Sequence, residues 1–370
     1  MPRCSLLSIV TLLMVAGATL LVSCSSDEGA ERPVPTSTPT AAPSIPKANS
    51  PSLPIPTAEV TVRVAHTPTP TPRLGPARGV SLSPKSLGSP DFPDFFPLAK
   101  EAGDLVRWAG SWEELANTSG APAVIAQLNS ASGLRTVIDT GVFATSQKRL
   151  FRPLDQPAQD FYVQAARAFA ARHKPDYLGI GVEINAHWEA EPKSFQTFVG
   201  LFSRTYDAVK VASPNTKVYT VFQLERLRGL KGGLFGGVND PSEAEWDLIG
   251  LFPKADLVGF TTYPGLIYRD PSDIPPDYYA EISRHTDKPI AFVEVGWSAS
   301  DAIPGWESSE TEQAAFVERF FELTAGLSPE TAIWLHLYEQ PANAPAFKGM
   351  GMVRDDGSKR PAWEAWTKPR

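Results

Sequence analysis

From residue 78 onward, short apolar segments alternate with segments of helical periodicity, and the alternation occurs eight times. The apolar segments suit strands that are buried on both faces. Their starts are roughly 25 to 45 residues apart, which fits a strand, a crossover helix and two loops. Eight such units predict an α/β fold, a single (β/α)8 TIM barrel. The predicted strands are 79–83, 104–108, 135–140, 177–183, 218–223, 256–262, 289–294 and 332–338.

A doubly wound open sheet is the alternative that the same alternation allows. Such sheets carry a Gly-rich phosphate-binding loop directly after a strand. None of the eight predicted strands is followed by a loop of that kind. The sequence therefore favours the closed barrel, and we expect no nucleotide or other cofactor.

The part of the chain before the repeat lacks the residues that a core needs. No aromatic residue occurs before Phe92, and residues 29–77 contain 12 of the 36 prolines. Proline at this density favours extended polyproline II over packed structure. We expect residues 24–77 to form a disordered Pro- and Thr-rich stalk, followed by the barrel domain at 78–370.

The extreme N-terminus has the pattern of a secretory signal. Arg3 precedes an apolar run at 6–21, which is too short for a comfortable transmembrane helix. The run ends in Leu21-Val22-Ser23-Cys24, which resembles the lipobox of bacterial lipoproteins. The resemblance implies that the signal peptide is 1–23 and that the Cys24 thiol is acylated, for instance with palmitate. The protein would then be extracytoplasmic, in the cell envelope, and anchored to the membrane by lipid. An ordinary signal peptide with an incidental cysteine is the alternative.

Charge and cysteine content exclude several classes of protein. The formal net charge is −7, whereas a nucleic-acid-binding protein needs a basic stripe to neutralise phosphates. Two cysteines make neither a disulfide scaffold nor a four-cysteine zinc site. No spacing of His, Asp and Glu resembles a metal site. We expect a monomer with no metal and no nucleic-acid partner.

Two of the predicted strands end in an isolated glutamate. Glu183 ends the fourth strand and Glu294 ends the seventh. A carboxylate at the end of an apolar strand is costly to desolvate unless it is paired or used. In a (β/α)8 barrel these strand ends meet at one mouth, where the chemistry takes place. Two carboxyl groups whose surroundings separate their pKa values are what glycosidic cleavage requires.

Three parts of the sequence, which are Arg107 and the segments 260–264 and 293–298, stand in the order and spacing of one known clan. They resemble the clan of retaining (β/α)8 glycoside hydrolases, which includes endo-β-1,4-galactanases and cellulases. The segment 293–298 is similar to the nucleophile segment of the galactanases, and 260–264 resembles the sixth-strand segment of the clan. Arg107 stands where the clan has a second-strand arginine. The resemblance covers 78–366 and implies a polysaccharide or oligosaccharide substrate.

The resemblance also implies roles for individual residues. Glu294 would be the nucleophile and Glu183 the general acid/base, with Arg107 and Tyr263 stabilising the charge of Glu294. Candidate substrate contacts near the strand ends are Trp108, Asn185, Trp188, Trp297 and Tyr338. Indole and phenol rings stack well on sugars, and packing in the core is the alternative for each tryptophan.

Two positions depart from the pattern of the clan. The clan has asparagine directly before the acid/base, where this chain has Val182, and Asn185 lies two residues after Glu183. The clan's tryptophan after the eighth strand corresponds to Tyr338. A non-catalytic carbohydrate-binding or solute-capture lipoprotein with a degenerate barrel site is therefore the alternative function. A carboxyl separation of about 5–5.5 Å between Glu183 and Glu294 would favour retaining hydrolysis.

Overall fold

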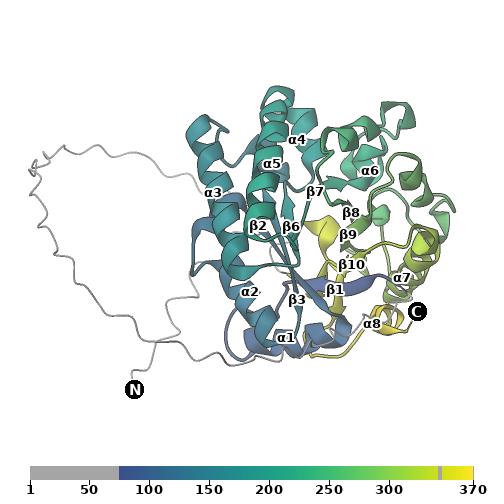
Figure 1. Ribbon diagram of the computed structural model, residues 1–370. Helices are drawn as coiled ribbons and strands as arrows, with labels where there is room; N and C mark the ends of the chain where they lie inside the picture. Colours follow the sequence, from purple (N-terminus) through teal and green to yellow (C-terminus); the bar gives the residue numbers. More distant parts are fainter. Residues whose placement is uncertain (1–74, 341–343, 370) are drawn as a thin grey trace, which may run out of the picture. The chain divides into compact units, whose positions relative to one another are not determined.

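The computed structural model describes residues 75–340 and 344–369, which contain a closed barrel of eight parallel strands (Figure 1). This confirms the predicted barrel and excludes the open sheet. The expected signal peptide, Cys24 and the expected stalk lie outside the described residues. The barrel strands are β1 (Ala77–Ser81), β2 (Leu105–Ser111), β3 (Arg135–Gly141), β6 (Tyr177–Ile180), β7 (Lys217–Gln223), β8 (Leu257–Thr262), β9 (Ile290–Val295) and β10 (Thr331–Trp334).

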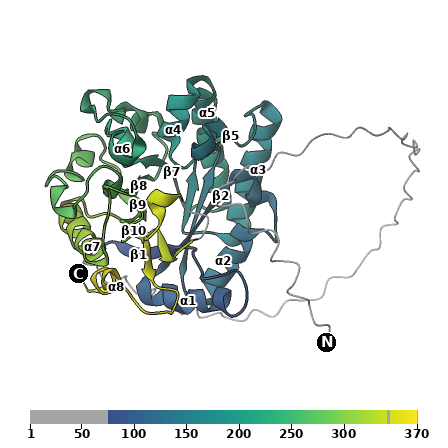
Figure 2. The same cartoon turned by 180° about the vertical axis from the view of Figure 1, so that it is seen from behind.

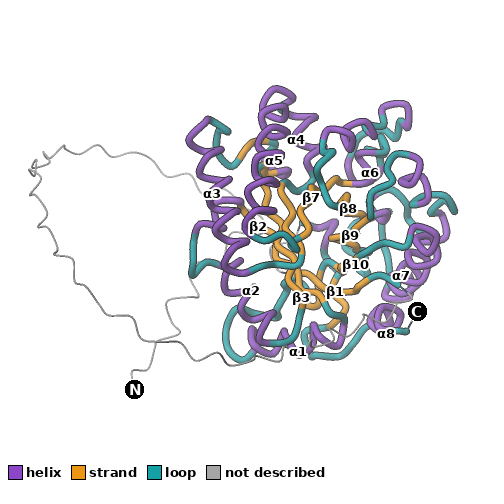
Figure 3. The backbone as a smooth tube through the Cα atoms, viewed as in Figure 1, coloured by secondary structure: helices purple, strands orange, loops and turns teal. Residues whose placement is uncertain are grey.

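Helices surround the strands, as Figure 3 shows by colour. They are α1 (Asp91–Ala102), α2 (Ala121–Ala131), α3 (Gln156–His173), α4 (Ile184–Ala190), α5 (Pro192–Ala212), α6 (Leu224–Leu227), α7 (Glu310–Thr324) and α8 (Pro361–Thr367). The short α4 and α6 lie at one end of the barrel and α8 lies at the other, and Figure 2 shows this from behind. Within the described ranges, no helix is long and apolar enough to cross a membrane.

The regular alternation of strand and helix fails after β7 and after β8. The connection between β7 and β8 contains only the four-residue α6 and three 3₁₀ turns, and that between β8 and β9 contains three 3₁₀ turns. Gly229, Gly233 and Gly236 adopt positive φ in the first connection, which interrupts a helix. The segment 264–276 in the second contains four prolines, which prevent a long helix from forming.

The predicted eighth strand, 332–338, is divided in two. β10 ends at Trp334, and β11 (His336–Tyr338) pairs with β12 (Gly351–Val353) in a separate two-stranded sheet. The chain turns away from β9 because the loop after β1 provides new partners. The Ser83 hydroxyl accepts a hydrogen bond from the Leu337 amide at 2.8 Å. Tyr338 therefore does not lie on a barrel strand.

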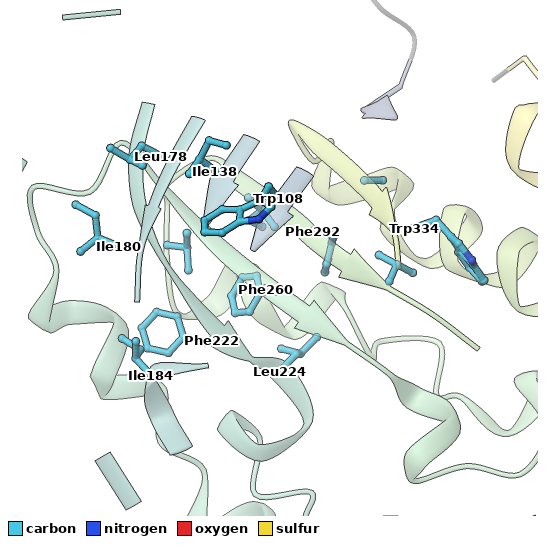
Figure 4. Close-up of a cluster of buried hydrophobic side chains, with 14 of the residues drawn as sticks. Trp108, Ile138, Leu178, Ile180, Ile184, Phe222, Leu224, Phe260, Phe292 and Trp334 are labelled. Carbon is cyan, nitrogen blue, oxygen red and sulfur yellow. The ribbon is translucent and has the colours of Figure 1, made fainter. Parts of the chain in front are cut away.

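Two apolar clusters make the core. One fills the barrel, and its members are Ala77, Leu105, Val137, Tyr177, Tyr219, Val221, Leu257, Ala291, Val293 and Ile333. The larger cluster packs the outer faces of the strands against the helices, and Figure 4 shows part of it. Side chains alternate between these layers along each strand. In β2, Leu105 faces inward and Val106 outward, so Arg107 points into the barrel and Trp108 points out of it.

β9 carries a bulge near its C-terminal end. Phe292 is paired with Phe260 of β8, but the next residue of β8, Thr261, is paired with Glu294, so Val293 is left over. Such an extra residue lets two consecutive side chains share one face of a sheet. Val293 belongs to the cluster inside the barrel, and Glu294 contacts the inward-facing Arg107. The bulge is what turns Glu294 inward.

Candidate active site

Glu294 is held by two donors inside the mouth of the barrel. The Arg107 Nη1 donates to one carboxylate oxygen and the Tyr263 hydroxyl donates to the other. Burial and the charge of Glu294 raise the pKa of Tyr263 well above its usual value, so the hydroxyl stays protonated and can donate. Burial disfavours the Arg107 cation, but the charges of Glu294 and Asp139 outweigh this and raise its pKa. Each oxygen of Glu294 thus has a fixed, permanently available donor.

Arg107 is in turn oriented from inside the barrel. Its Nε donates to Asp139, and the Tyr219 hydroxyl donates to Asp139 Oδ1 at 2.5 Å. Arg107, Asp139 and Tyr219 are all almost completely buried. A Cβ at Gly179 would lie 2.0 Å from Asp139 Oδ1, so only glycine leaves room for this carboxylate. A continuous chain of polar contacts runs from Tyr219 to Glu294.

Glu183 reaches the same place from a different backbone conformation. Gly181 has φ of 86°, and β6 ends one residue earlier, at Ile180. Glu183 therefore lies after the strand, whereas the sequence predicts a strand that includes it. Glu183 has φ of 52° and ψ of 46°, the left-handed region, and forms the N-cap of α4. The Thr261 hydroxyl donates to its Oε1 at 2.9 Å. Thr261 is also the strand partner of Glu294, so this bond holds the Glu183 carboxyl group beside the strand position of Glu294.

The surroundings of Glu183 favour its protonated form. Burial and, next, the negative charge of Glu294 raise the pKa of Glu183 to about 7, although the bond from Thr261 opposes the shift. Glu183 has no cation bonded to it, in contrast to Glu294. The site therefore offers one carboxyl group that holds a proton near neutral pH and one carboxylate fixed by donors. That combination can supply a general acid and a nucleophile.

A third carboxylate, Glu225, lies fully buried beside this pair. Its Oε1 accepts bonds from the Thr262 hydroxyl at 2.8 Å, the Tyr278 hydroxyl at 2.8 Å and the Tyr263 amide at 3.0 Å. Its Oε2 accepts a bond from the Gln223 amide group. Burial raises the pKa of Glu225. Both carboxylate oxygens of Glu225 are therefore hydrogen-bonded. Through these bonds Glu225 connects α6 to β8 and fixes the backbone of Tyr263.

Two of the tryptophans proposed as sugar contacts are packed in the core. Trp108 points outward, and a Cβ at Gly110 would lie 2.3 Å from its ring (Figure 4). Trp297 stacks on Phe316 of α7 at 5.1 Å, and its Nε1 donates to Ser308 at 3.0 Å. Trp297 also lines a small cavity of about 30 Å³ together with Tyr268 and Trp306. For both residues the structure gives a packing role.

The remaining expected contacts differ in how accessible they are. Asn185 is fully buried, and its amide both donates to the Gln223 carbonyl at 3.0 Å and accepts from the Gln223 amide at 2.9 Å. It therefore joins α4 to β7 and has no oxygen or nitrogen directed to a substrate. Trp188 is half-buried against Phe195. Tyr338 is half-buried on β11, outside the barrel wall.

Four residues of this site were not predicted as site residues from the sequence. Asp139 and Tyr219 orient Arg107, Thr261 contacts Glu183, and Glu225 fixes the backbone of Tyr263. Asp139 is a carboxylate near the end of an apolar strand, two residues before Gly141, and this is the signal that marks it. Across the described ranges, no three His, Cys, Asp or Glu side chains come together in a group that could hold a metal ion.

The chain is similar to known proteins in its structure but does not match them in its sequence. No family model and no curated protein matches the chain. It is similar to the Ignisphaera aggregans GH53 catalytic domain, with 17% identity and a TM-score of 0.56, over 80% of this chain and 97% of that one. It is also similar to a GH5_18 variant from Streptomyces cattleya in complex with Manb1-4GlcNAc, with 16% identity and a TM-score of 0.56, over 79% of each chain.

A third similar structure is a family 39 glycoside hydrolase from the gut symbiont Bacteroides cellulosilyticus WH2. The identity is 17% and the TM-score 0.54, over 80% of this chain. The match spans 63% of that longer protein. At such low identities the likeness concerns the fold. It confirms the expected resemblance to the (β/α)8 barrels of glycoside hydrolases.

Proposed function

We propose that this protein is a glycoside hydrolase that cleaves O-glycosidic bonds of a polysaccharide or oligosaccharide by a retaining mechanism. The observation that carries the proposal is that Glu183 accepts a bond from Thr261, the strand partner of Glu294, while the two carboxyl groups have opposite surroundings. The similar structures, whose names are those of glycoside hydrolases, support the class of substrate. We also propose that the protein is a monomer and has no nucleic-acid partner.

The mechanism has two steps. In the first, a Glu294 oxygen attacks the anomeric carbon and forms a glycosyl ester, while protonated Glu183 gives its proton to the departing oxygen. Arg107 and Tyr263 hold Glu294 in position for the attack. In the second, ionised Glu183 takes a proton from water as the water oxygen attacks the same carbon. The ester bond breaks, Glu294 is released as a carboxylate, and the configuration of the sugar is retained.

The alternative is a non-catalytic carbohydrate-binding or solute-capture protein. One observation favours it. Asn185 uses its amide on the backbone of Gln223, so it cannot replace the sugar contact that the clan makes from the position of Val182. A barrel without that contact has less transition-state stabilisation to offer.

A screen of the full-length mature protein tests both functions. It would be incubated with β-1,4-linked galactan, mannan, glucan and xylan, with new reducing ends and the anomeric form of the first product as readouts. We expect hydrolysis of at least one of them, with a product of retained configuration. Glu294→Gln, which keeps the shape of the side chain, is the control. Binding without hydrolysis would establish the alternative, and inverted product would exclude the two-step mechanism.

We further propose that Cys24 is lipidated and anchors the protein in the cell envelope, outside the cytoplasm. The lipobox-like sequence before Cys24 supports this. Cells grown with a tagged fatty acid should label the wild-type protein in the membrane fraction. Cys24→Ser should be unlabelled and either soluble or uncleaved. Equal labelling and partition of the two proteins would rule out the anchor.

A further inference from the structure

Phe151 differs from the other aromatic residues near the barrel in its exposure. In the described part of the chain, Phe151 at 39% and Phe161 at 42% are the most exposed of the phenylalanines and tryptophans. The tryptophans expected to contact sugar are buried or half-buried. Single exposed apolar side chains are common on protein surfaces, so it is the position of Phe151 that bears on its role.

The ring of Phe151 lies at the mouth of the barrel. β3 ends at Gly141, which shares its inward face with Asp139 two residues earlier. A Cβ at Gly141 would be 3.5 Å from Cε2 of the Phe151 ring. The ring therefore covers the inward side of the end of β3, about 7 Å further along the strand than Asp139. Asp139 holds Arg107, which contacts Glu294.

The backbone around Phe151 is fixed in place. Phe151 follows an antiparallel pair of β4 (Phe143–Ala144) and β5 (Arg149–Leu150), and its amide donates to the Val142 carbonyl at 3.0 Å. The Phe143 ring stacks on His187 of α4 with centroids 5.1 Å apart. Because α4 begins directly after Glu183, the same short helix supports both Glu183 and the hairpin that carries Phe151.

The neighbouring cation does not cover the ring. Arg152 forms an ion pair with Glu113 at 3.2 Å, and its guanidinium lies over the Trp112 ring at 5.8 Å. With Arg152 engaged elsewhere, this cation leaves the exposed apolar surface of the Phe151 ring uncovered. The C–H face of a pyranose ring has the shape and polarity to pack on it, because aromatic faces attract C–H groups that carry partial positive charge.

We propose that Phe151 is a stacking platform for a sugar unit of the substrate, one that is not itself cleaved. This inference rests on the carbohydrate substrate of the proposed function and adds a binding subsite on the β3 side of the mouth. The platform would hold a saccharide that extends from the two carboxyl groups over the end of β3. It would strengthen binding of chains of several units and would leave a single sugar next to the scissile bond unaffected.

Phe161 provides a matched control for this proposal. It is a phenylalanine of similar exposure, but it lies on α3 and packs edge-on against Trp112 at 5.9 Å. Phe151→Ala removes a phenyl ring at the end of β3, and Phe161→Ala removes the same ring from α3. Phe151→Leu keeps apolar volume without an aromatic face, and Phe151→Trp keeps the face.

The test is affinity electrophoresis of the full-length protein in gels that contain galactan, galactomannan, hydroxyethylcellulose or arabinoxylan. We expect at least one polysaccharide to retard the wild type, and Phe151→Ala and Phe151→Leu to weaken that affinity by about tenfold. Phe151→Trp and Phe161→Ala should bind as the wild type does. Equal loss in both alanine variants, no loss in either, or no retardation of the wild type by any of the four would overturn the platform.

The measurement does not depend on catalysis, so the two proposals can fail separately. If the wild type is retarded and Phe151→Ala is not, but no polysaccharide is cleaved, the platform stands and the glycosidase does not. If polysaccharides are cleaved and the affinity is the same with and without Phe151, the enzyme stands and the platform does not.

Discussion

The two sides of the barrel mouth present the same side chain in opposite surroundings. On the β9 side, Glu294 accepts bonds from a buried arginine and a buried tyrosine, and Asp139 fixes that arginine from below. On the β6 side, Glu183 receives one bond from the Thr261 hydroxyl, and burial raises its pKa to about 7. In the proposed mechanism, it is this difference in partners, and not the residue type, that would assign different roles to the two glutamates.

Removing Glu294 should have the largest effect. Glu294→Ala deletes the nucleophile, so we expect kcat to fall by about 10⁴-fold or more on every substrate. Azide should then enter the vacated space and yield a glycosyl azide of inverted configuration. Product analysis and steady-state rates of the folded variant check this. A rate within tenfold of the wild type would remove Glu294 from the mechanism.

Removing Glu183 should have an effect that depends on the leaving group. With a poor leaving group, Glu183→Ala should lower kcat by about 10²–10⁴-fold, because no acid protonates the departing oxygen. With an activated aryl glycoside the first step should persist, and azide should speed the second with retained configuration. In the wild type, activity on natural saccharides should decline as the pH rises through about 7 and Glu183 loses its proton. If both glutamate variants respond alike to leaving group and azide, the assigned asymmetry is wrong.

The chain of contacts below Glu294 can be weakened with a matched pair of variants. The Tyr219 hydroxyl bonds to Asp139 inside the barrel, and the Tyr162 hydroxyl bonds to Thr140 on the other face of β3, each at 2.5 Å. Tyr162→Phe should cost about 1 kcal/mol of stability, and Tyr219→Phe about 1.5–3 kcal/mol, because the acceptor of Tyr219 is a carboxylate. Only Tyr219→Phe should lower kcat, by roughly threefold to tenfold, because it loosens Arg107.

Equal kinetic effects in the two variants would show that the contact chain has a structural role alone. Melting temperatures of both variants are needed beside the rates, since they show how much stability each change removed. The conservative replacement Asp139→Asn keeps the shape of the chain while it removes the charge. It should lower kcat more than Tyr219→Phe does.

The smallest expected effect is on stability and depends on pH. The pKa of Glu183 rises from the usual 4.5 to about 7 on folding, so the folded protein binds the proton more tightly. Stability from this group is then fully present below pH 4.5 and is lost as the pH rises through about 7. Glu183→Gln lacks this loss. Its melting temperature should gain about 5 °C on the wild type between pH 5 and pH 8.

The matching control for this measurement is an exposed glutamate. Glu113→Gln, on the surface beside Arg152, should change the melting temperature by a similar small amount at both pH values. If the melting temperatures of Glu183→Gln and the wild type change by the same amount from pH 5 to pH 8, the raised pKa of Glu183 is contradicted.

The sequence predicted the features that follow from strand periodicity. Eight buried strands, the closed barrel and the positions of Glu183 and Glu294 near two strand ends were all derivable, because alternation and length identify such strands. Arg107 and Tyr263 also lie at the site, as the resemblance implied. These features depend on local pattern and on the order of elements along the chain.

The features that the sequence did not reveal depend on register and on packing. A bulge at Val293 changes which face Glu294 takes, and no residue in β9 marks it. Trp108 could have pointed to either face of β2, and only the register with the inward Leu105 decides it. The side-chain amide of Asn185 could form hydrogen bonds with a sugar or with the backbone. Because α4 lies close to β7, this amide bonds to the backbone of Gln223.

The left-handed backbone of Glu183 also bears on how this protein can change over generations. A non-glycine residue in that conformation costs roughly 1–2 kcal/mol, so glycine at this position would stabilise the fold. If Glu183 is the acid of the proposed mechanism, selection for activity opposes that gain. In a lineage that no longer needed the proposed acid, Glu183→Gly would be among the favourable mutations. On the proposed function, the glutamate at this position costs the fold stability that glycine would provide.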